Sequence, residues 1–305
     1  MSAIENRDGA GPLAFAAVGF SYVSWGLMPA YWKMCGGADG FVVLGHRAVW
    51  TALFVALALA ASGRAGAVAA TVARIRADAR SAALFALLVL MAAINWWVNA
   101  QAAYLCRIVE IGAGQFLTPL MTVALGVICF KERLTRAKRA GLALAAAGLA
   151  VMVAGLPSFP WLTLTVSSSW AVYSAAKRKL QLNPAASTML EALAMAPLAA
   201  AYLTLTQDAG GPGWTVPGDA AGTAALVGTG VVTSLPLITY AYAANAMPLN
   251  VLGFCQYLSP MLAIGLGVLV YGEAFGGARL AAMAFVWAGI AAILAEQARQ
   301  RRPAP

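Results

Sequence analysis

Charged side chains are scarce in this chain of 305 residues: Asp, Glu, Lys and Arg make up 10% of it, whereas 62% is hydrophobic. A soluble domain carries about a quarter charged residues. One membrane span takes about 20 apolar residues, so ten spans would occupy roughly two thirds of the chain. The composition therefore excludes an ordinary soluble protein, predicts an all-α membrane protein, and leaves no room for a second, water-soluble domain.

Metal ligands and catalytic groups are equally few. The chain has one histidine, His46, and its four cysteines show no C-x-x-C spacing. One histidine cannot build the usual multi-ligand metal site, and scattered serines with a single histidine form no nucleophile-and-base arrangement. We therefore expect no metal and no cofactor, and an intramembrane enzyme is the least favoured class. The spacing does not decide whether Cys35 and Cys106 form a disulfide.

The N-terminal region also lacks the features of a cleavable signal peptide. Arg7 is the only cation before the first apolar run, which continues to about Lys33 and is too long for a signal sequence, so we interpret it as a transmembrane helix. Apolar stretches bounded by charge, Gly or Pro predict ten helices in all, at 12–33, 41–62, 82–105, 109–130, 140–156, 160–180, 185–206, 221–244, 249–271 and 278–295.

The net charge of +9 comes from basic residues in short loops. With a cytoplasmic N-terminus, most of them fall in cytoplasmic connections, above all in 64–80 and 131–139, whereas Lys33, Arg107 and Arg279 fall outside. The positive-inside rule then places both termini in the cytoplasm and predicts a multi-pass protein of a bacterial inner membrane. Loop charges that orient the chain explain its basicity without nucleic acid as a partner.

An internal repeat divides the chain into halves at 1–156 and 157–305. Residues 115–119 read QFLTP and residues 256–260 read QYLSP, and the same offset of 141 aligns Glu132 with Glu273. A weaker match at an offset of 145 aligns Trp25 with Trp170 and His46 with Glu191. Because five helices is an odd number, the second half must be inverted in the membrane. Inverted repeats are typical of secondary transporters.

Three blocks carry a resemblance to a known family: WGLMPAYWK at 25–33, HRAVW at 46–50 and PLNVLGFCQYLSP at 248–260. The chain resembles the EamA-type transporters of the drug/metabolite transporter superfamily, most closely the RarD group. The resemblance implies a ten-helix inner-membrane exporter or facilitator of small organic molecules that works as a secondary carrier. At 113–116 the sequence AGQF departs from the SLGYF that is usual in the family, beside the expected cavity, so the resemblance names no substrate.

Paired prolines give the strongest prediction of a binding site. A proline leaves the carbonyl four residues earlier without its helical hydrogen bond, which here is the carbonyl of Gln115 before Pro119 and of Gln256 before Pro260. Helix breaks at equivalent places in two halves indicate a transporter's central site. The alternative is that these prolines only bend their helices.

Aromatic and amide side chains complete the predicted substrate site. Trp25 belongs to a stripe with Tyr22, Pro29 and Trp32 on one face of the first helix, a pattern that suits flat or apolar solutes and equally suits ordinary core packing. Asn95 and Asn99 share a face, where they contact either a wet cavity or another helix. The remaining residues predicted to contact substrate are Trp170, Tyr173 and Tyr257.

Four ionisable residues at membrane depth are candidates for coupling or charge recognition: His46, Arg47, Glu110 and Glu191. His46 either titrates with the coupling proton or stays neutral and joins two helices. Arg47 either snorkels to the headgroups or contacts an anion or the substrate, and Glu110 is its expected protein partner. A His46–Glu191 ion pair is not expected, because the two residues lie near opposite membrane faces.

These patterns favour a secondary transporter of small organic solutes, with amino-acid-like or aromatic solutes preferred, that works by alternating access. The alternative is a passive pore or membrane scaffold without ion coupling. The expected partners are the substrate and the lipid bilayer, with a proton as the candidate coupling ion, and a monomer or homodimer is expected.

Overall fold

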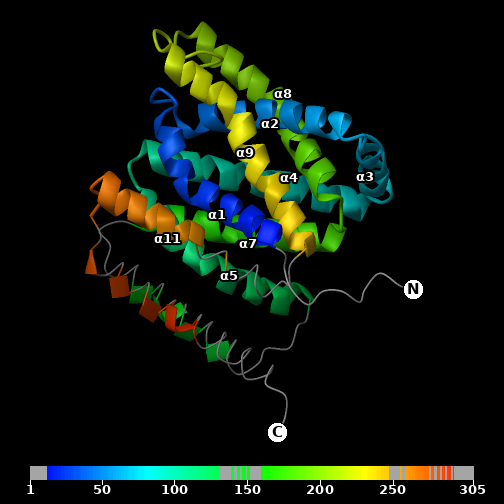
Figure 1. The fold of residues 1–305 in the computed structure, drawn as a ribbon. Coiled ribbons are helices and arrows are strands. Elements are labelled where there is room, and N and C mark those ends of the chain that lie inside the picture. The colour runs from blue at the N-terminus through cyan, green and yellow to red at the C-terminus, as the bar shows by residue number, and fades with distance from the viewer. Residues whose placement is uncertain are drawn as a thin grey trace.

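The computed structural model describes residues 12–130 and 159–246, together with shorter stretches between 139 and 151 and between 255 and 291. The described part of the chain is built from helices (Figure 1). In chain order they are α1 (Pro12–Lys33), α2 (Gly40–Ala61), α3 (Gly66–Arg76), α4 (Ala79–Tyr104), α5 (Ile108–Phe130), α7 (Trp161–Leu180), α8 (Pro184–Asp208), α9 (Ala220–Ala246), α11 (Leu258–Gly265) and the π-helical turn η1 (Leu266–Val270).

The predicted spans agree with these helices wherever the chain is described. Seven of the ten predicted segments, from 12–33 to 109–130 and from 160–180 to 221–244, are confirmed as helices whose ends agree within a few residues. Five helical segments are long and apolar enough to cross a membrane: α1, α2, α4, α8 and the part of α9 from Ala220 to Tyr240. The spans at 140–156 and 278–295 lie mostly outside the described residues, so the count of ten helices stays a prediction.

Helix α3 corrects the sequence analysis, which treated residues 64–80 as a loop. Val68 and Ile75 turn toward α4, α7 and α8, and they pack beside Met189 and Leu180 respectively. Arg74 and Arg76 occupy the last turn, where positive charge offsets the helix dipole. The helix was missed because 11 residues are too few to be predicted as a membrane span.

Side-chain caps fix where several helices begin. Asp39 accepts hydrogen bonds from the backbone N–H groups of Phe41 and Val42 at the start of α2, and Asn183 accepts one from Ala186 at the start of α8. Asp78 caps α4, and hydrogen bonds from the backbone N–H and hydroxyl of Ser81 hold the pKa of this carboxyl below its usual value. Each cap satisfies donors that would otherwise have no partner.

Helices α2 and α8, which the repeat predicts to be equivalent, pack side by side and run in opposite directions. Gly45 near the start of α2 lies against Leu203 near the end of α8. At the other end, Val55 and Leu59 of α2 pack on Met189 of α8. Opposite direction of equivalent helices is what an inverted repeat requires.

Two further helix pairs run antiparallel, and each joins a helix of one predicted half to a helix of the other. Helix α1 runs antiparallel to α9, with Val18 packed near Ala243 and the Tyr31 hydroxyl donating to the carbonyl of Ala225 at 2.7 Å. Helix α4 runs antiparallel to α7, with Ala102 near Leu162 at one end and α4 residues around Leu88 near the end of α7 at the other. The first helix of each half therefore packs against a helix of the opposite half (Figure 1).

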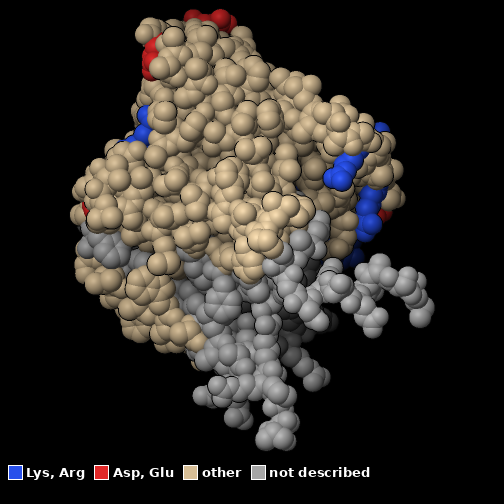
Figure 2. Space-filling model, in the orientation of Figure 1, with Lys and Arg blue, Asp and Glu red and all other residues tan. Residues whose placement is uncertain are grey.

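Charge is distributed unevenly over the described surface. Figure 2 shows Lys and Arg side chains around α3 and acidic side chains where α8 connects to α9. The C-terminal end of α7, with Lys177 and Lys179, packs at the α3 end. This distribution supports a cytoplasmic α3 end under the positive-inside rule.

Polar contacts at the opposite end join segments of the two predicted halves. The carboxylate of Glu273, which follows η1, accepts hydrogen bonds from the backbone N–H groups of Ile108 and Val109 at 2.8 and 2.7 Å. It thereby caps the N-terminus of α5 from the other half, where a negative charge is favoured. Cys35 and Cys106 near this end are both free thiols, and burial raises the pKa of Cys35 to about 12.

Thiol labelling tests the predicted sidedness. On a cysteine-free background, cysteines at the exposed positions Arg76 and Asp208 are expected to lie on opposite sides of the membrane, with Arg76→Cys cytoplasmic. A membrane-impermeant maleimide applied to intact cells should therefore label Asp208→Cys, and label Arg76→Cys only after permeabilisation. Labelling of both from the same side would contradict the topology.

Close packing of α2 on α9 gives a second prediction. A Cβ atom at Gly230 would lie 2.6 Å from the carbonyl carbon and oxygen of Trp50. Backbone atoms cannot move aside cheaply, so Gly230→Ala should lower the free energy of unfolding by about 1–3 kcal/mol, measured as a lower Tm in detergent. Gly19→Ala is the control, because no atom lies within 4 Å of its new Cβ. Equal Tm values for the two variants would contradict this packing.

Candidate functional site

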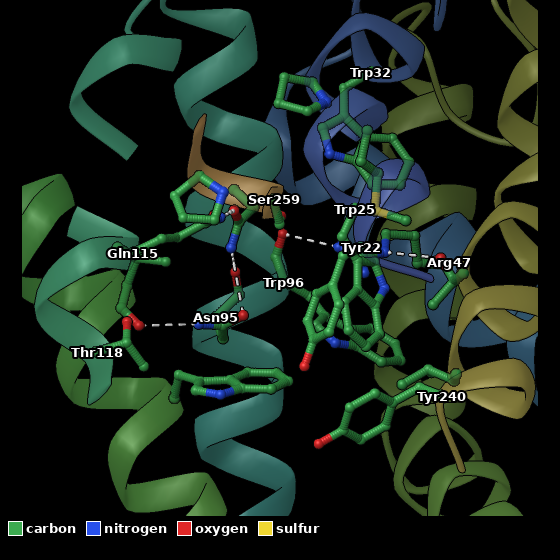
Figure 3. A pocket seen from close by; sticks show the side chains of 18 of the residues that line it. Tyr22, Trp25, Trp32, Arg47, Asn95, Trp96, Gln115, Thr118, Tyr240 and Ser259 are labelled. Atoms are coloured by element: carbon green, nitrogen blue, oxygen red, sulfur yellow. Dashed lines mark hydrogen bonds between the residues drawn. The ribbon is translucent and has the colours of Figure 1, made fainter. Parts of the chain in front are cut away.

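A cavity of about 420 Å³ lies between helices of the two predicted halves. Figure 3 shows polar Gln115 and Asn95 on one side of it and the rings of Tyr22, Trp25 and Tyr240 on the other. The described residues that line it are Tyr22, Trp25, Met28, Pro29, Trp32, Arg47, Asn95, Trp96, Asn99, Gln115, Thr118, Val166, Trp170, Ser174, Thr233, Leu237, Tyr240, Ser259 and Pro260.

Aromatic rings from both halves form one wall of the cavity. Trp25 lies 5.3 Å from Tyr22 in an edge-to-face contact and 5.4 Å from Tyr240. Trp170, the predicted counterpart of Trp25, also lines the cavity and stacks on Tyr173 at 5.2 Å. Rings fixed by such contacts present flat apolar surfaces that suit an aromatic or apolar solute.

A chain of amides forms the facing wall. Gln115 donates to the Asn99 side chain, and Asn99 donates to the backbone carbonyl of Asn95 at 2.8 Å. Asn95 in turn donates to the carbonyl of Val166 and the hydroxyl of Ser169, both at 3.1 Å. The asparagines therefore join α4 to α7 as well as lining the cavity, and Gln115 at the end of the chain is the member best placed to contact a solute.

Arg47 carries the one charge among the described residues that line the cavity. Only 5% of its surface is exposed, so it does not snorkel to the headgroups and that alternative is wrong. Its guanidinium lies 4.8 Å from the ring centroid of Trp32 and 4.5 Å from that of Trp96. It donates from Nε to Thr233 at 3.2 Å and from Nη1 to the carbonyl of Trp96 at 3.3 Å.

The expected contact between Arg47 and Glu110 is also wrong. Glu110 is 2% exposed, and Arg107 pairs with it, at 2.8 Å from Nε and 2.5 Å from Nη2. Residues three apart at the start of a helix meet without any long-range fold, so the local cation takes this carboxylate. Arg47 is thus left without an acidic partner among the residues that the structure describes.

His46 is completely buried and lies away from the cavity lining. Its Nε2 lies 2.8 Å from the carbonyl oxygen of Gly213, and the Trp50 indole N–H donates to its Nδ1 at 3.1 Å. A carbonyl can only accept and an indole N–H can only donate, so these partners fit the neutral imidazole with its proton on Nε2. The geometry favours the interpretation that His46 joins α2 to the connection between α8 and α9.

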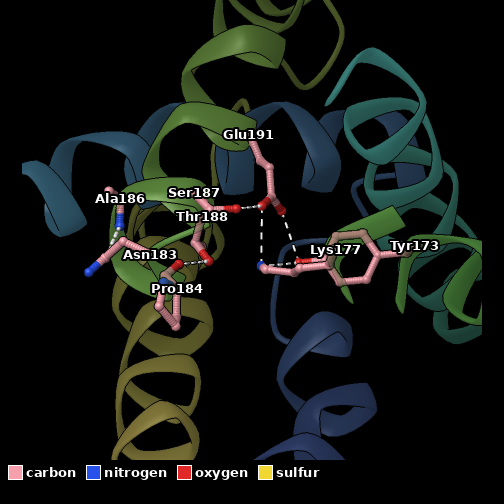
Figure 4. Close-up of polar contacts among 8 residues, drawn as sticks. All are labelled: Tyr173, Lys177, Asn183, Pro184, Ala186, Ser187, Thr188 and Glu191. Atoms are coloured by element: carbon pink, nitrogen blue, oxygen red, sulfur yellow. Dashed lines mark hydrogen bonds and ion pairs between the residues drawn. The ribbon is translucent and has the colours of Figure 1, made fainter. Parts of the chain in front are cut away.

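Glu191 belongs to a buried polar cluster with α7 (Figure 4). Its carboxylate accepts hydrogen bonds from Lys177 at 3.2 Å, from the Tyr173 hydroxyl at 3.0 Å, and from Ser187. Tyr173 therefore contacts Glu191 rather than the cavity, one layer behind Trp170. His46 and Glu191 do not contact each other, as expected.

Positions that the predicted repeat makes equivalent line the same cavity. Trp25 and Trp170 correspond at an offset of 145, and Thr118 and Ser259 correspond at 141 within the paired QFLTP and QYLSP blocks. Pro260 lines the cavity as well. Helix α5 continues through residue 119, so it does not end at Pro119. Gln256 and Tyr257 lie outside the described residues, and their predicted roles stay predictions.

Several lining residues were not singled out from the sequence. Thr118 and Ser259 precede the paired prolines, so the repeat itself could have identified them. Thr233, Leu237 and Tyr240 lie on α9, whose hydroxyl side chains are spread around the helix and so give no sign of which face meets the cavity. No group of three His, Cys, Asp or Glu among the described residues could hold a metal.

Comparisons with known proteins identify the family. The profile of the EamA-like transporter family matches residues 159–295. Protein RarD of Streptomyces exfoliatus is 31% identical over 282 residues, covering 92% of this chain and 88% of that protein. An uncharacterized transporter of Vibrio cholerae is 31% identical over 275 residues, covering 88% of each, and Protein RarD of Salmonella typhimurium is 30% identical over 297 residues, covering 95% and 96%.

The fold is shared with a solved protein. A crystal structure with 20% sequence identity matches with a TM-score of 0.62 and covers 97% of this chain and 100% of that one. The chain belongs to the EamA-like transporter family, and its relatives place it among the RarD-type transporters. It is a multi-pass membrane transporter of the drug/metabolite superfamily, and not an enzyme.

The hydrogen bonds of His46 generate a prediction about pH. If the neutral imidazole only joins helices, His46→Gln should leave the shape of the transport pH profile between about pH 5 and 8 unchanged. His46→Ala, which leaves the Gly213 carbonyl and the Trp50 N–H unpaired, should lower the unfolding free energy by about 2–4 kcal/mol. A flattened pH profile in His46→Gln would instead assign the coupling proton to His46.

Proposed function

We propose that this chain is a secondary transporter of the bacterial inner membrane that exports small organic solutes, or facilitates their movement, by alternating access. Amino-acid-like or aromatic solutes are the proposed substrates, and the cavity beside Trp25, Asn95 and Gln115 is the proposed binding site. Gln256 and Tyr257 are proposed to contribute from the second half. The carrier is proposed to have two inverted halves, at 1–156 and 157–305, and cytoplasmic termini.

One observation carries this proposal: a single cavity takes equivalent residues from both repeats, such as Trp25 with Trp170 and Thr118 with Ser259. Two halves that contribute alike to a central site can rock about it and expose it to either side in turn. The antiparallel α2–α8 contact supports the same arrangement, since it places equivalent helices back to back.

A polar contact at one end provides an element that such rocking would break and form. At the end opposite α3, Glu273 of the second half holds the start of α5 in the first half. At the α3 end, the Lys177–Glu191 pair joins α7 to α8 within the second half, so it would move with that half. Breaking the Glu273 contacts would separate the halves on one side, which is the change that opening there requires.

The chemistry of the cavity fits a flat solute with at least one polar group. Trp25, Trp170 and Tyr240 offer ring faces, and Gln115 offers an amide that can donate and accept without the desolvation cost of a charge. Pocket walls that are mostly apolar, with a few placed polar groups, are typical of small-molecule sites.

Transport assays separate a carrier from a passive pore. In proteoliposomes that hold purified protein, a carrier exchanges labelled solute for unlabelled solute across the membrane and saturates, whereas a pore gives flux proportional to concentration. Imposing a pH gradient tests whether a proton is coupled. Linear, non-saturating flux of solutes without exchange would contradict the proposed mechanism.

The amide wall yields a direct mutational prediction. Gln115→Leu keeps the bulk of the side chain and deletes its hydrogen bonds, so substrate affinity should fall by about 5- to 150-fold, corresponding to about 1–3 kcal/mol. Gln207→Leu is the matched control, because Gln207 is also half-buried and lies outside the cavity lining. Unchanged binding by Gln115→Leu, or collapse of its fold, would place the site elsewhere.

A further inference from the structure

The charge of Arg47 is buried without a countercharge in the described part of the protein. The two salt bridges found there are Arg107–Glu110 and Lys177–Glu191, and no Asp or Glu is among the described cavity-lining residues. An arginine stays protonated even when buried, and a charge at membrane depth normally faces a cavity or a partner. The site therefore has a fixed positive charge that something else in the cavity can neutralise.

Two aromatic rings lie against the Arg47 guanidinium, and only part of its hydrogen-bonding capacity is used. The rings of Trp32 and Trp96 lie within 5 Å of the guanidinium carbon, where they attract the cation. Of the five N–H donors of a guanidinium, one binds Thr233 and one binds the Trp96 carbonyl, and the other three have no hydrogen-bond partner among the described residues. Those three donors belong to Nη1 and Nη2, the pair that binds a carboxylate with two parallel hydrogen bonds.

We infer that the cavity selects organic monocarboxylates with a flat aromatic body, and that Arg47 binds the carboxylate between Trp32 and Trp96. This inference rests on the proposed function and narrows its substrate class. The aromatic body would lie against Trp25 and Tyr240, whose rings form the apolar wall. A carboxylate supplies the missing negative charge and can accept one remaining N–H from each terminal guanidinium nitrogen, which an amide or an amine cannot do.

Solutes related to the carboxylate are expected to bind with lower affinity. An amine would bring a second positive charge beside Arg47, and no described lining residue carries the negative charge to offset it. A neutral amide would accept one hydrogen bond and leave the guanidinium charge uncompensated. A zwitterionic amino acid is expected to bind more weakly than the acid without the amino group.

Binding of three matched probes to the purified protein in nanodiscs tests the inference: indole-3-acetate, indole-3-acetamide and tryptamine, which at pH 7 are an anion, a neutral molecule and a cation. Isothermal titration calorimetry should show indole-3-acetate binding at least about tenfold more tightly than the other two, the effect expected for charge-assisted hydrogen bonds. This comparison uses the unmodified protein and so does not depend on the folding of any variant.

Variants then assign the preference to Arg47. In Arg47→Gln the acid and the amide should bind equally, and Arg47→Lys, which keeps the charge but loses the planar pair of donors, should show an intermediate preference. Arg74→Gln, an equal loss of charge on exposed α3, should leave the tenfold preference intact. Persistence of the preference in a folded Arg47→Gln would overturn the inference.

Failure of the inference and failure of the proposed function give different results. Equal binding of all three probes, tighter binding of the amide or amine, or no binding of indole-3-acetate would each overturn the inference. The proposed function would still stand if proteoliposomes exchanged other organic solutes by saturable transport. Linear flux, or the absence of exchange for any solute of a cell extract, would instead overturn the proposed function.

Discussion

A positive charge held inside a membrane bundle is the constraint on which the candidate site depends. Removing an ion from water costs several kcal/mol unless hydrogen bonds and opposite charges replace its hydration. Thr233, the Trp96 carbonyl and two indole rings replace part of that hydration around Arg47. They supply no negative charge, so the guanidinium has no countercharge among the described residues. Because Arg47 lines the cavity, a solute bound there can supply that charge.

The other ionisable groups at membrane depth have partners within the protein. Glu110 is paired by Arg107, Glu191 by Lys177, Tyr173 and Ser187, and both nitrogens of His46 are occupied. Among the described residues, three buried polar atoms have no hydrogen-bond partner: Thr51 Oγ1, Trp97 Nε1 and Glu110 Oε1. Glu110 and Glu191 each have a basic partner and His46 is neutral, whereas Arg47 has no acidic partner among the described residues. Glu273 contacts the start of α5 from the other predicted half, and that contact is one that a rocking motion would break.

Long apolar runs, cap residues and an aligned repeat were enough to predict seven helices within a few residues, because each depends on local sequence. Trp25, Trp170 and Gln115, which the predicted repeat singled out, line one cavity, and their role in binding a solute stays a prediction. Side-chain partners were predicted less well, because membrane depth alone does not say which side chains meet. Arg47 was assigned to Glu110 from their similar depth, although Arg107, three residues before Glu110, is the partner that local helix geometry favours. Helix α3 was missed because its 11 residues are too few for a membrane span.

The family, the antiparallel equivalent helices and the shared cavity lead to one central claim, that this cavity lies on the transport path and is reached from both sides of the membrane. A single thiol in the cavity tests it most directly. Ser174 lines the cavity, and Ser174→Cys on a cysteine-free background changes one atom. The account predicts that a membrane-impermeant thiol reagent modifies this cysteine from either face of the membrane. Modification from only one face, or from neither, would contradict it.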